Sequence, residues 1–477
     1  MIRRDKEDFL DDYNRLIDIN VIKDVISEFE EDLNRLEKYK NYYVGKVNYQ
    51  LPKELQGLLP NDLNVNFAKE IVDTATSYTF DKPVIYSDGG FDDWLKDWYG
   101  LIDEHGHNKS VVKGASIYGC NYELITMEDD LIGTDMPTLS TLSPLNTFLV
   151  EDNTPKHKPF IGVYFTIDND RTGTLKGYNV YIYTKNYIYR AKGNTLKELH
   201  IISEEQHYFG GIPINRLKNN RECTNDFECV LGLIDYYNLI EIYRLSDTKQ
   251  WTDKTLVLEN SSMGDTEEER QQGLKMWVKD RLIELEEGGK AYYITAQIDE
   301  NQIQVKQDNT KKLIHQIAKI PDLSSINVGA NTSGVAMAYT QFDTEQLASA
   351  KETEFKKFLR RRLNLINNIM TLKNKSIDVA NVNIKMKRNV PDNIDNNLKL
   401  FQATKDEVSL RTRYTFLNIE ADYDEEMKYL EKETKMKASW IQSQYDNYDY
   451  NDTTKINKAR EEVELQQDKA NADKEEK

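Results

Sequence analysis

The feature of this sequence that most constrains its fold is a pair of long helical stripes separated by a compact insertion. Apolar residues recur every three or four positions over about residues 226–251 and again over 335–372, which is the period of an amphipathic helix. Between them, residues 255–305 read as two short strands around a charged helix, and a further helix over 308–320 follows. Helices that flank such an inserted module predict an elongated chain with a stalk and a tip, rather than one globule.

The remaining segments predict a mixed α+β fold. Residues 7–44 read as two helices that end at Gly45, and residues 64–80 read as another amphipathic helix. From 159 to 202 the apolar period changes to two, which predicts an antiparallel sheet. Residues 393–436 read as helical again.

The charge balance limits how this chain can contact nucleic acid. Among 477 residues, 63 Lys and Arg stand against 81 Asp and Glu, so the net charge is −18. This surplus excludes a basic protein that binds DNA by global charge attraction. It leaves open a protein that touches DNA locally or lets DNA slide past. The length predicts two or more domains.

The sequence predicts neither a zinc site nor a membrane span. The three cysteines, Cys120, Cys223 and Cys229, lack zinc spacing and read as free thiols of a reducing cytoplasm. No stretch is long and apolar enough to span a bilayer, and the charged start does not resemble a signal peptide.

Catalytic motifs are also missing from the sequence. The segment closest to a phosphate-binding loop, Gly329 to Gly334, lacks the Lys that supplies charge to the phosphates. His105 and His107 would place two imidazoles near a metal, but a pair without a third ligand more often marks a solvated turn. We therefore expect no enzyme, no cofactor and no metal site.

Two groups of basic residues are candidate contacts, and each has two interpretations. The first group lies on the long helix and meets either phosphates or acidic groups of a neighbouring subunit: Lys356, Lys357, Arg360, Arg361 and Arg362. The second lies on or beside the preceding helix, at spacings that place several on one face: Lys306, Lys311, Lys312 and Lys319. These lysines either line a channel or form the solvated side of an amphipathic helix.

The order of these elements resembles the portal (head–tail connector) proteins of tailed bacteriophages, in the siphophage-type branch, over roughly residues 20–435. The order and spacing of several segments together make the resemblance specific. These segments are Asn66–Thr74 with Asp81–Val84, Ser143–Phe148 with Glu151–Asn153, Gly211–Ile214 with Asn219 and Asn220, Asp226–Glu228 with Leu233–Asn238, and Ser333–Met337 with Phe342 and Phe358–Leu363.

The resemblance implies a portal fold assembled in a ring, and it implies a role for each part of the chain. The parts are a wing of helices and antiparallel sheet at 1–225, a first stem helix at 226–254, a small α/β clip at 255–305, a second stem helix at 306–321, a tunnel loop at 322–334, the spine helix and strand of the wing at 335–390, a helical crown at 391–445, and a polar, charged tail at 446–477 that we expect to be mobile.

The resemblance also implies a function at one vertex of the virion. A ring, with twelve subunits expected, would assemble in the host cytoplasm and conduct double-stranded DNA during packaging by the terminase and during ejection. The implied partners are the terminase large subunit, head-completion or adaptor proteins, and the major capsid and scaffolding proteins. The alternative is a minor capsid or head–tail adaptor protein that binds other virion proteins and conducts no DNA.

In the portal interpretation, the tunnel loop faces the DNA. Its small, mostly uncharged residues offer weak contacts and a mobile backbone, which suit a surface that grips and releases a duplex. The candidate DNA-facing residues are Ser325, Asn327, Gly329, Asn331, Thr332 and Ser333.

The loop assignment makes one testable prediction. Replacing Asn327, Asn331 and Thr332 by Ala should impair DNA packaging or retention, because the loop would lose its polar contacts to the duplex, and should leave ring assembly intact. Packaged DNA per particle and electron microscopy of the purified ring measure the two effects. Loss of the ring instead would identify the loop as an assembly element.

Overall fold

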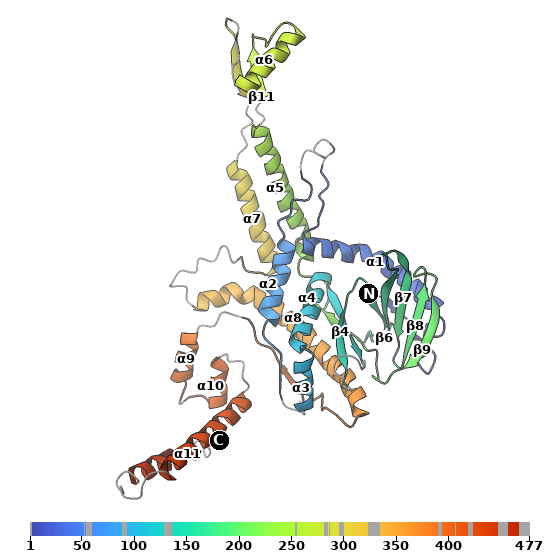
Figure 1. The fold of residues 1–477 in the computed structure, drawn as a ribbon, viewed down its shortest axis with the longest axis vertical. Helices are drawn as coiled ribbons and strands as arrows, with labels where there is room; N and C mark the ends of the chain where they lie inside the picture. Colours follow the sequence, from blue (N-terminus) through green and yellow to red (C-terminus); the bar gives the residue numbers. More distant parts are fainter. Residues whose placement is uncertain are drawn as a thin grey trace. The chain divides into compact units, whose positions relative to one another are not determined.

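The computed structural model of the chain is a mixed α+β protein, as the sequence predicts (Figure 1). The structure describes residues 2–51, 53, 60–87, 93–127, 136–252, 255–280, 285, 287–294, 300–322, 334–389, 394–405, 407–417, 423–446 and 457–466. The chain divides into two units, Met1–Asn389 and Val390–Lys477. This division lies next to the predicted start of the crown at residue 391.

Six strands form the larger sheet of the first unit. In spatial order they are β1 (Ile2–Arg4), β5 (Thr147–Asp152), β6 (Pro159–Asn169), β7 (Leu175–Tyr183), β8 (Tyr187–Gly193) and β9 (His200–Gln206). β1 pairs with β5 in parallel, and the other neighbours are antiparallel. The predicted antiparallel sheet over 159–202 is therefore confirmed.

A long helix, α1 (Asn20–Val44), packs against this sheet (Figure 1). Phe29 of α1 stacks on Phe148 of β5, with ring centroids 4.7 Å apart. The helix ends, as predicted, at Gly45, whose φ of 74° is left-handed and favours glycine. The other helix predicted within 7–44 is only a 3-10 turn, Lys6–Asp8. The Asp11 carboxylate accepts bonds from two nearby backbone N–H groups and so competes with a helix there.

A second sheet has three strands in the order β10 (Ile214–Lys218), β3 (Cys120–Thr126) and β4 (Thr138–Leu142). The helix α4 (Glu104–Tyr118) packs on β3, and both α2 (Phe67–Phe80) and α3 (Asp93–Leu101) pack on α4. The helix predicted over 64–80 is confirmed as α2. The edge strand β4 was not predicted, because its five residues carry little apolar period.

Two helices with a small module between them follow in sequence. A short 3-10 turn leads into α5 (Leu231–Thr252), and α7 (Glu300–Ala318) follows the module. In the module, β11 (Thr255–Glu259) and β12 (Lys290–Ile294) pair antiparallel, and α6 (Glu267–Asp280) connects them in sequence. The predicted strand–helix–strand order is confirmed. α7 begins at Glu300, however, so the predicted clip boundary at residue 305 falls inside a helix.

The longest helix of the described chain, α8 (Gly334–Thr371), matches the prediction of a helix over 335–372. Its buried face includes Phe355, Leu359 and Ile366, which pack into a core shared with α2, α3 and α4. After α8, the strand β13 (Asn383–Lys385) pairs antiparallel with β2 (Ile85–Ser87). The strand predicted over 377–386 is therefore limited to three residues.

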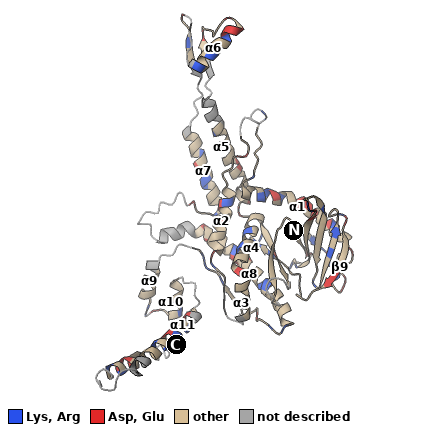
Figure 2. Cartoon of the chain, viewed as in Figure 1, with Lys and Arg blue, Asp and Glu red and all other residues tan. Residues whose placement is uncertain are grey.

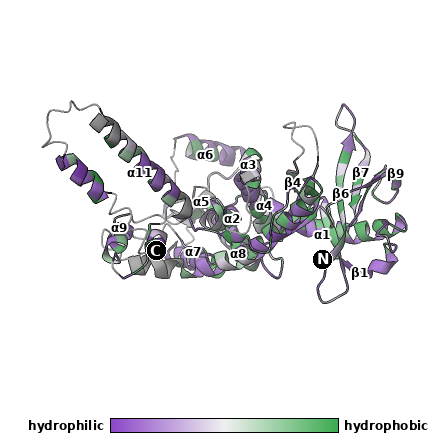
Figure 3. Ribbon diagram, turned by 90° about the horizontal axis from the view of Figure 1, so that it is seen from below, coloured by the Kyte–Doolittle hydropathy of each residue, from purple (hydrophilic) through white to green (hydrophobic). Residues whose placement is uncertain are grey.

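The second unit is helical, as predicted for 393–436. It contains α9 (Ile394–Ala403), α10 (Leu410–Phe416) and α11 (Tyr423–Asp446). The Arg413 guanidinium of α10 lies 4.3 Å from the centre of the Phe401 ring and ties α10 to α9. α11 is mostly hydrophilic (Figure 3). Within the predicted tail, residues 457–466 are helical, and 447–456 and 467–477 lie outside the described residues.

The aromatic packing of α8 makes a prediction about stability. Phe355 is fully buried and meets the Phe80 ring edge-on at 5.0 Å. Replacing Phe355 by Ala should lower the free energy of unfolding by about 3–5 kcal/mol, because a cavity forms in the core. Urea unfolding measures this loss. The same substitution at Phe342, which is 60% exposed on the same helix, is the control and should have little effect. Equal losses would contradict the assigned core.

Candidate functional site

The predicted DNA-facing loop lies outside the described residues. All six of its candidate contacts fall within 323–333, and they are Ser325, Asn327, Gly329, Asn331, Thr332 and Ser333. The site is therefore built here from the helices α5 and α7 before this loop and from α8 after it.

A buried polar contact sets the register between α5 and α7. Gln307 of α7 accepts a hydrogen bond from Arg244 of α5 at 2.5 Å and donates one to Glu241 of α5. The Gln307 amide is buried, and both its oxygen and its nitrogen form a hydrogen bond. Because a buried polar group without partners costs free energy, a slip of either helix would be unfavourable.

An aromatic contact anchors α5 and α7 to α2. The Phe67 ring of α2 meets Tyr237 of α5 at 5.0 Å and His315 of α7 at 6.0 Å, edge-on in both cases. Val65 donates a backbone hydrogen bond of 2.7 Å to the buried Asn238 side chain of α5. The helix pair is thus held at the start of α2.

The four predicted stem lysines are spread around α7. Lys306 and Lys312 are exposed, Lys311 pairs with Asp322 at 3.2 Å, and Lys319 donates to Gln346 at 3.1 Å. Residues five positions apart on a helix are turned by about 140°, so the interpretation that several of these lysines share one face does not hold for Lys306 and Lys311. Figure 2 shows Lys and Arg segments along α7.

Arg362 of the basic run lies at the centre of a buried ion cluster. Its side chain is 0% exposed. The guanidinium donates to Glu104 of α4 at 2.9 Å, to Glu123 of β3 at 2.9 Å and to Asn108 of α4 at 2.8 Å. It has no surface through which to meet DNA or a neighbouring subunit. The predicted surface contact is therefore wrong for Arg362, and its acidic partners belong to its own chain.

The cluster strongly favours the ionised form of Glu123. Burial by itself raises the pKa of this carboxyl, but the Arg362 charge and the hydrogen bond from His107 lower it to about 2. The His107 Nε2 atom lies 3.1 Å from Glu123 Oε2. His105 and His107 belong to the first turn of α4, so the prediction of a solvated turn at this position is wrong.

The other members of the basic run have separate environments. Lys356 pairs with Glu352 at 2.5 Å and Lys357 with Glu354 at 2.6 Å, both on α8 itself. The Arg360 guanidinium lies 3.4 Å from the Val379 carbonyl oxygen. Arg361 lines a cavity between α8 and the larger sheet. Consecutive residues of a helix are turned by about 100°, which explains why neighbours in sequence do not act as one cluster.

A second buried ion cluster was not predicted. Lys351 of α8 is buried, and its ammonium donates to Ser116 at 2.7 Å, Asn219 at 2.6 Å and Asp226 at 2.8 Å. Burial lowers the pKa of Lys351 and the Asp226 charge partly offsets this. Asp226 precedes α5 by a few residues, so the pair links α8 to the segment that leads into α5. No sequence signal marks two charges that lie 125 positions apart.

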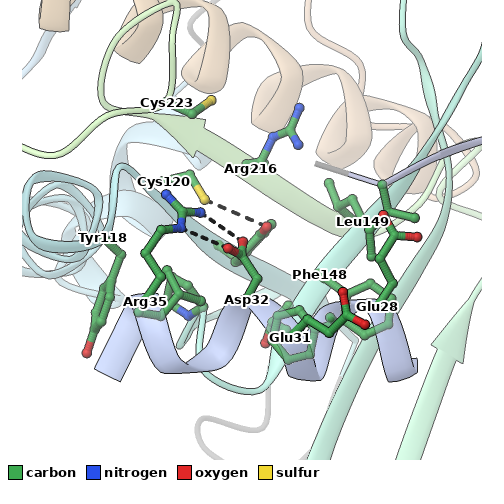
Figure 4. A pocket seen from close by; sticks show the side chains of 16 residues that line it. Glu28, Glu31, Asp32, Arg35, Tyr118, Cys120, Phe148, Leu149, Arg216 and Cys223 are labelled. Atoms are coloured by element: carbon green, nitrogen blue, oxygen red, sulfur yellow. Dashed lines mark hydrogen bonds and ion pairs between the residues drawn. The ribbon is translucent and has the colours of Figure 1, made fainter. Parts of the chain in front are cut away.

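Figure 4 shows a cavity of about 370 Å³ between α1, β3, β5 and β10. Arg35 and Asp32 of α1 pair at 2.8 Å at its wall, and the Cys120 Sγ atom lies 3.8 Å from the Tyr122 hydroxyl. Burial raises the pKa of the Cys223 thiol, which keeps it protonated and weakly nucleophilic. The cavity therefore lacks an activated thiolate at this cysteine.

The described part of the chain offers neither a clustered metal site nor a membrane-spanning helix. These residues include no group of three or more His, Cys, Asp or Glu side chains arranged to hold a metal ion. No described helix is long and apolar enough to cross a membrane.

The sequence of the chain matches a known protein family. The sequence model of the family described as "Phage portal protein, SPP1 Gp6-like" matches residues 22–439. A solved structure, "Neck of empty GTA particle computed with C6 symmetry", is similar at 12% identity and a TM-score of 0.43, covering 74% of this chain and 90% of that chain. No curated protein matches the chain.

The Arg362 cluster makes stability depend on acidic pH. Because the pKa of Glu123 is lower in the folded chain than in the unfolded chain, its contribution is present above about pH 4.5 and is lost as the pH falls toward 2. At pH 6, Glu123→Gln should cost about 3 kcal/mol of unfolding free energy. The difference between the two proteins should shrink as the pH falls below 4.5.

Urea unfolding of both proteins across this pH range measures the effect. The control is Glu205→Gln, because Glu205 forms a surface ion pair with Arg190 at 3.4 Å and such pairs contribute little. A gap between wild type and Glu123→Gln that stays constant with pH would contradict the assigned pairing.

Proposed function

The chain belongs to the phage portal protein family, SPP1 Gp6-like, and on that basis we propose that it forms the ring at one capsid vertex through which double-stranded DNA is packaged and later ejected. The observation that supports this proposal is the match to the family model, which spans residues 22–439. That span includes the segments assigned by resemblance to the stem, the clip and the spine, and most of those assigned to the wing and the crown.

In this proposal each part of the ring has its own partner. The clip module, β11 to β12, meets the terminase large subunit during packaging and head-completion or adaptor proteins afterwards. The major capsid and scaffolding proteins surround the ring, which has twelve subunits and assembles in the host cytoplasm before it becomes part of the virion. The ring acts as a conduit, without catalysis and without a cofactor.

Exposed apolar side chains on α7 support assembly. Leu313 and Ile317 are one helical turn apart and are each 45% exposed, although α7 packs on α5 through its other side. Side chains of this kind on one helix flank are characteristic of protein contacts. In a ring, one repeated heterologous contact covers the same flank in every copy.

The charge on the stem supports a conduit rather than a DNA clamp. Lys306 and Lys312 are exposed on α7, whereas Lys311 is paired with Asp322. A net charge of −18 per chain repels phosphates, and a few exposed lysines on each subunit offset part of that repulsion. Such a surface lets a duplex move without the salt-sensitive hold that rings of unpaired Arg would give.

Negative-stain electron microscopy of the purified chain tests the proposal directly. We expect rings with a central hole, because the stem and wing contacts repeat around one axis. Monomers or open filaments would count against a portal and would favour an adaptor. A packaging assay with the terminase then separates a conducting ring from one that only binds other virion proteins.

The apolar flank of α7 makes a prediction about assembly. Leu313→Glu combined with Ile317→Glu should prevent ring formation, since it places charges in the contact between subunits, and should leave the subunit folded. Light scattering after gel filtration measures the particle mass, and circular dichroism checks the fold. Gln316→Glu, an exposed position on the same helix, is the control and should still form rings. Rings formed by the double variant would exclude this flank from the subunit contact.

A further inference from the structure

A basic cavity lies between the spine helix α8 and the larger sheet. Its volume is about 610 Å³, within the usual range for small-molecule sites. One face of α8 lines it, at positions spaced by three and four residues: Arg361, Asn364, Leu365 and Asn368. The opposite wall comes from the start of β6, the turn before β8 and the loop that contains Gly210 and Gly211.

The charge of this cavity is opposite to that of the chain. Four cationic side chains line it, Arg361, Lys6, Lys158 and Lys185, against one carboxylate, Asp152. The Asp152 carboxylate accepts hydrogen bonds from Thr154 at 2.7 Å and from the Lys158 backbone at 3.0 Å, and these contacts lower its pKa. The lining thus carries a net charge of three positive units in a protein of net charge −18.

Arg361 is the cation that α8 contributes to this cavity, and it forms no ion pair with a described carboxylate. Its Nε atom is buried without a hydrogen-bond partner, and one Nη atom lies 3.4 Å from the Ile212 carbonyl oxygen. Among the described residues no carboxylate forms an ion pair with it. Burial and the nearby Arg216 charge lower its pKa to about 10, so the group is still cationic at neutral pH.

Two neighbouring arginines, unlike Arg361, are paired with carboxylates. Arg362 is paired with Glu104 and Glu123, and Arg216 is paired with Glu151. A buried guanidinium without an anion is unfavourable, because the charge has lost its water and gained no partner. The ammonium groups of Lys158 and Lys185 are exposed and form no ion pair with a described residue, so they are available to the same ligand.

We propose that this cavity binds a phosphate-type oxyanion, either inorganic phosphate or the phosphate of a small phosphomonoester. A guanidinium presents two parallel N–H donors to such an oxyanion, and the lysines add charge at the rim. A single carboxylate would neutralise only one of the three surplus charges, whereas a phosphate group carries about −1.5 to −2 at neutral pH. The inference rests on the cavity of the subunit and is independent of the portal function.

The test compares sodium phosphate with sodium chloride at equal ionic strength and pH, using the purified full-length chain. We expect the wild-type Tm to rise by roughly 2–4 °C in phosphate and to saturate, because an anion that binds only the folded state stabilises it. Titration calorimetry with inorganic phosphate and with a 5′-mononucleotide distinguishes the two sources. Tighter binding of the nucleotide assigns the cavity to a phosphomonoester, and equal binding assigns it to the free ion.

Variants separate a binding site from a structural role. Arg361→Gln should weaken phosphate binding by on the order of tenfold or more, and in chloride it should be at least as stable as wild type, because an unpaired buried charge is removed. Lys158→Gln, at the rim, should weaken binding without affecting the fold. Lys192→Gln is the control: Lys192 pairs with Asp168 at 2.6 Å outside the cavity, and this variant should keep the full phosphate response.

Several results would overturn the proposal. One is a wild-type Tm that is the same in phosphate and in chloride, which would show that the cavity takes no such ion. A second is an Arg361→Gln protein that keeps the phosphate response. A third is an Arg361→Gln protein that fails to fold in chloride while Lys158→Gln binds phosphate normally. A fourth is an Arg361→Gln protein that loses ring assembly with no phosphate effect in wild type, which would assign Arg361 to a carboxylate of a neighbouring copy.

Discussion

The structure depends first on the buried Arg362 guanidinium, which joins three elements of the wing. It meets Glu104 at the start of α4, Glu123 on β3 and Asn108 one turn along α4. A shift of α8 by one turn would separate the guanidinium from both carboxylates and leave buried charges uncompensated, which costs about 3–5 kcal/mol for one broken pair. The ion cluster therefore sets the position of the spine helix, and the apolar side chains around it, such as Phe355 and Leu359, supply the free energy of packing.

A second buried cation, Lys351, links the same helix to the segment before α5. Lys351 lies on the same helix as Arg362, eleven residues earlier, which is close to three full turns, so both point to one side of α8. Its partner Asp226 precedes α5 by a few residues. The spine helix thus fixes both the wing core and the point where the stem begins. In the proposed ring, a load on the stem reaches the wing through this pair.

The parts of the fold that were predictable are those that depend on local periodicity. The long helix α8 and the strands β6 to β8 follow from apolar residues at helical or alternate spacing. The pairing of β1 with β5 and the early start of α7 at Glu300 depend on partners or polar residues that carry no period. The prediction of a surface contact is wrong for Arg362 for a related reason. Arg360, Arg361 and Arg362 are adjacent in sequence, but the helix directs them to a backbone carbonyl, a cavity and the core, respectively.

The pairing of cations in the interior also affects how the net charge of −18 acts at the surface. Three cations of the interior are neutralised by carboxylates of the same chain: Arg362 by two glutamates, Lys351 by Asp226 and Arg216 by Glu151. Because both members of each pair lie in the interior, these cations add no positive charge to the surface of the subunit. In the proposed ring, the acidic surplus of the chain would repel a passing duplex and oppose the tight, salt-sensitive binding that counterion release drives. An acidic chain is therefore compatible with the proposed conduction of DNA, because these three cations stabilise the fold and are not available to phosphates.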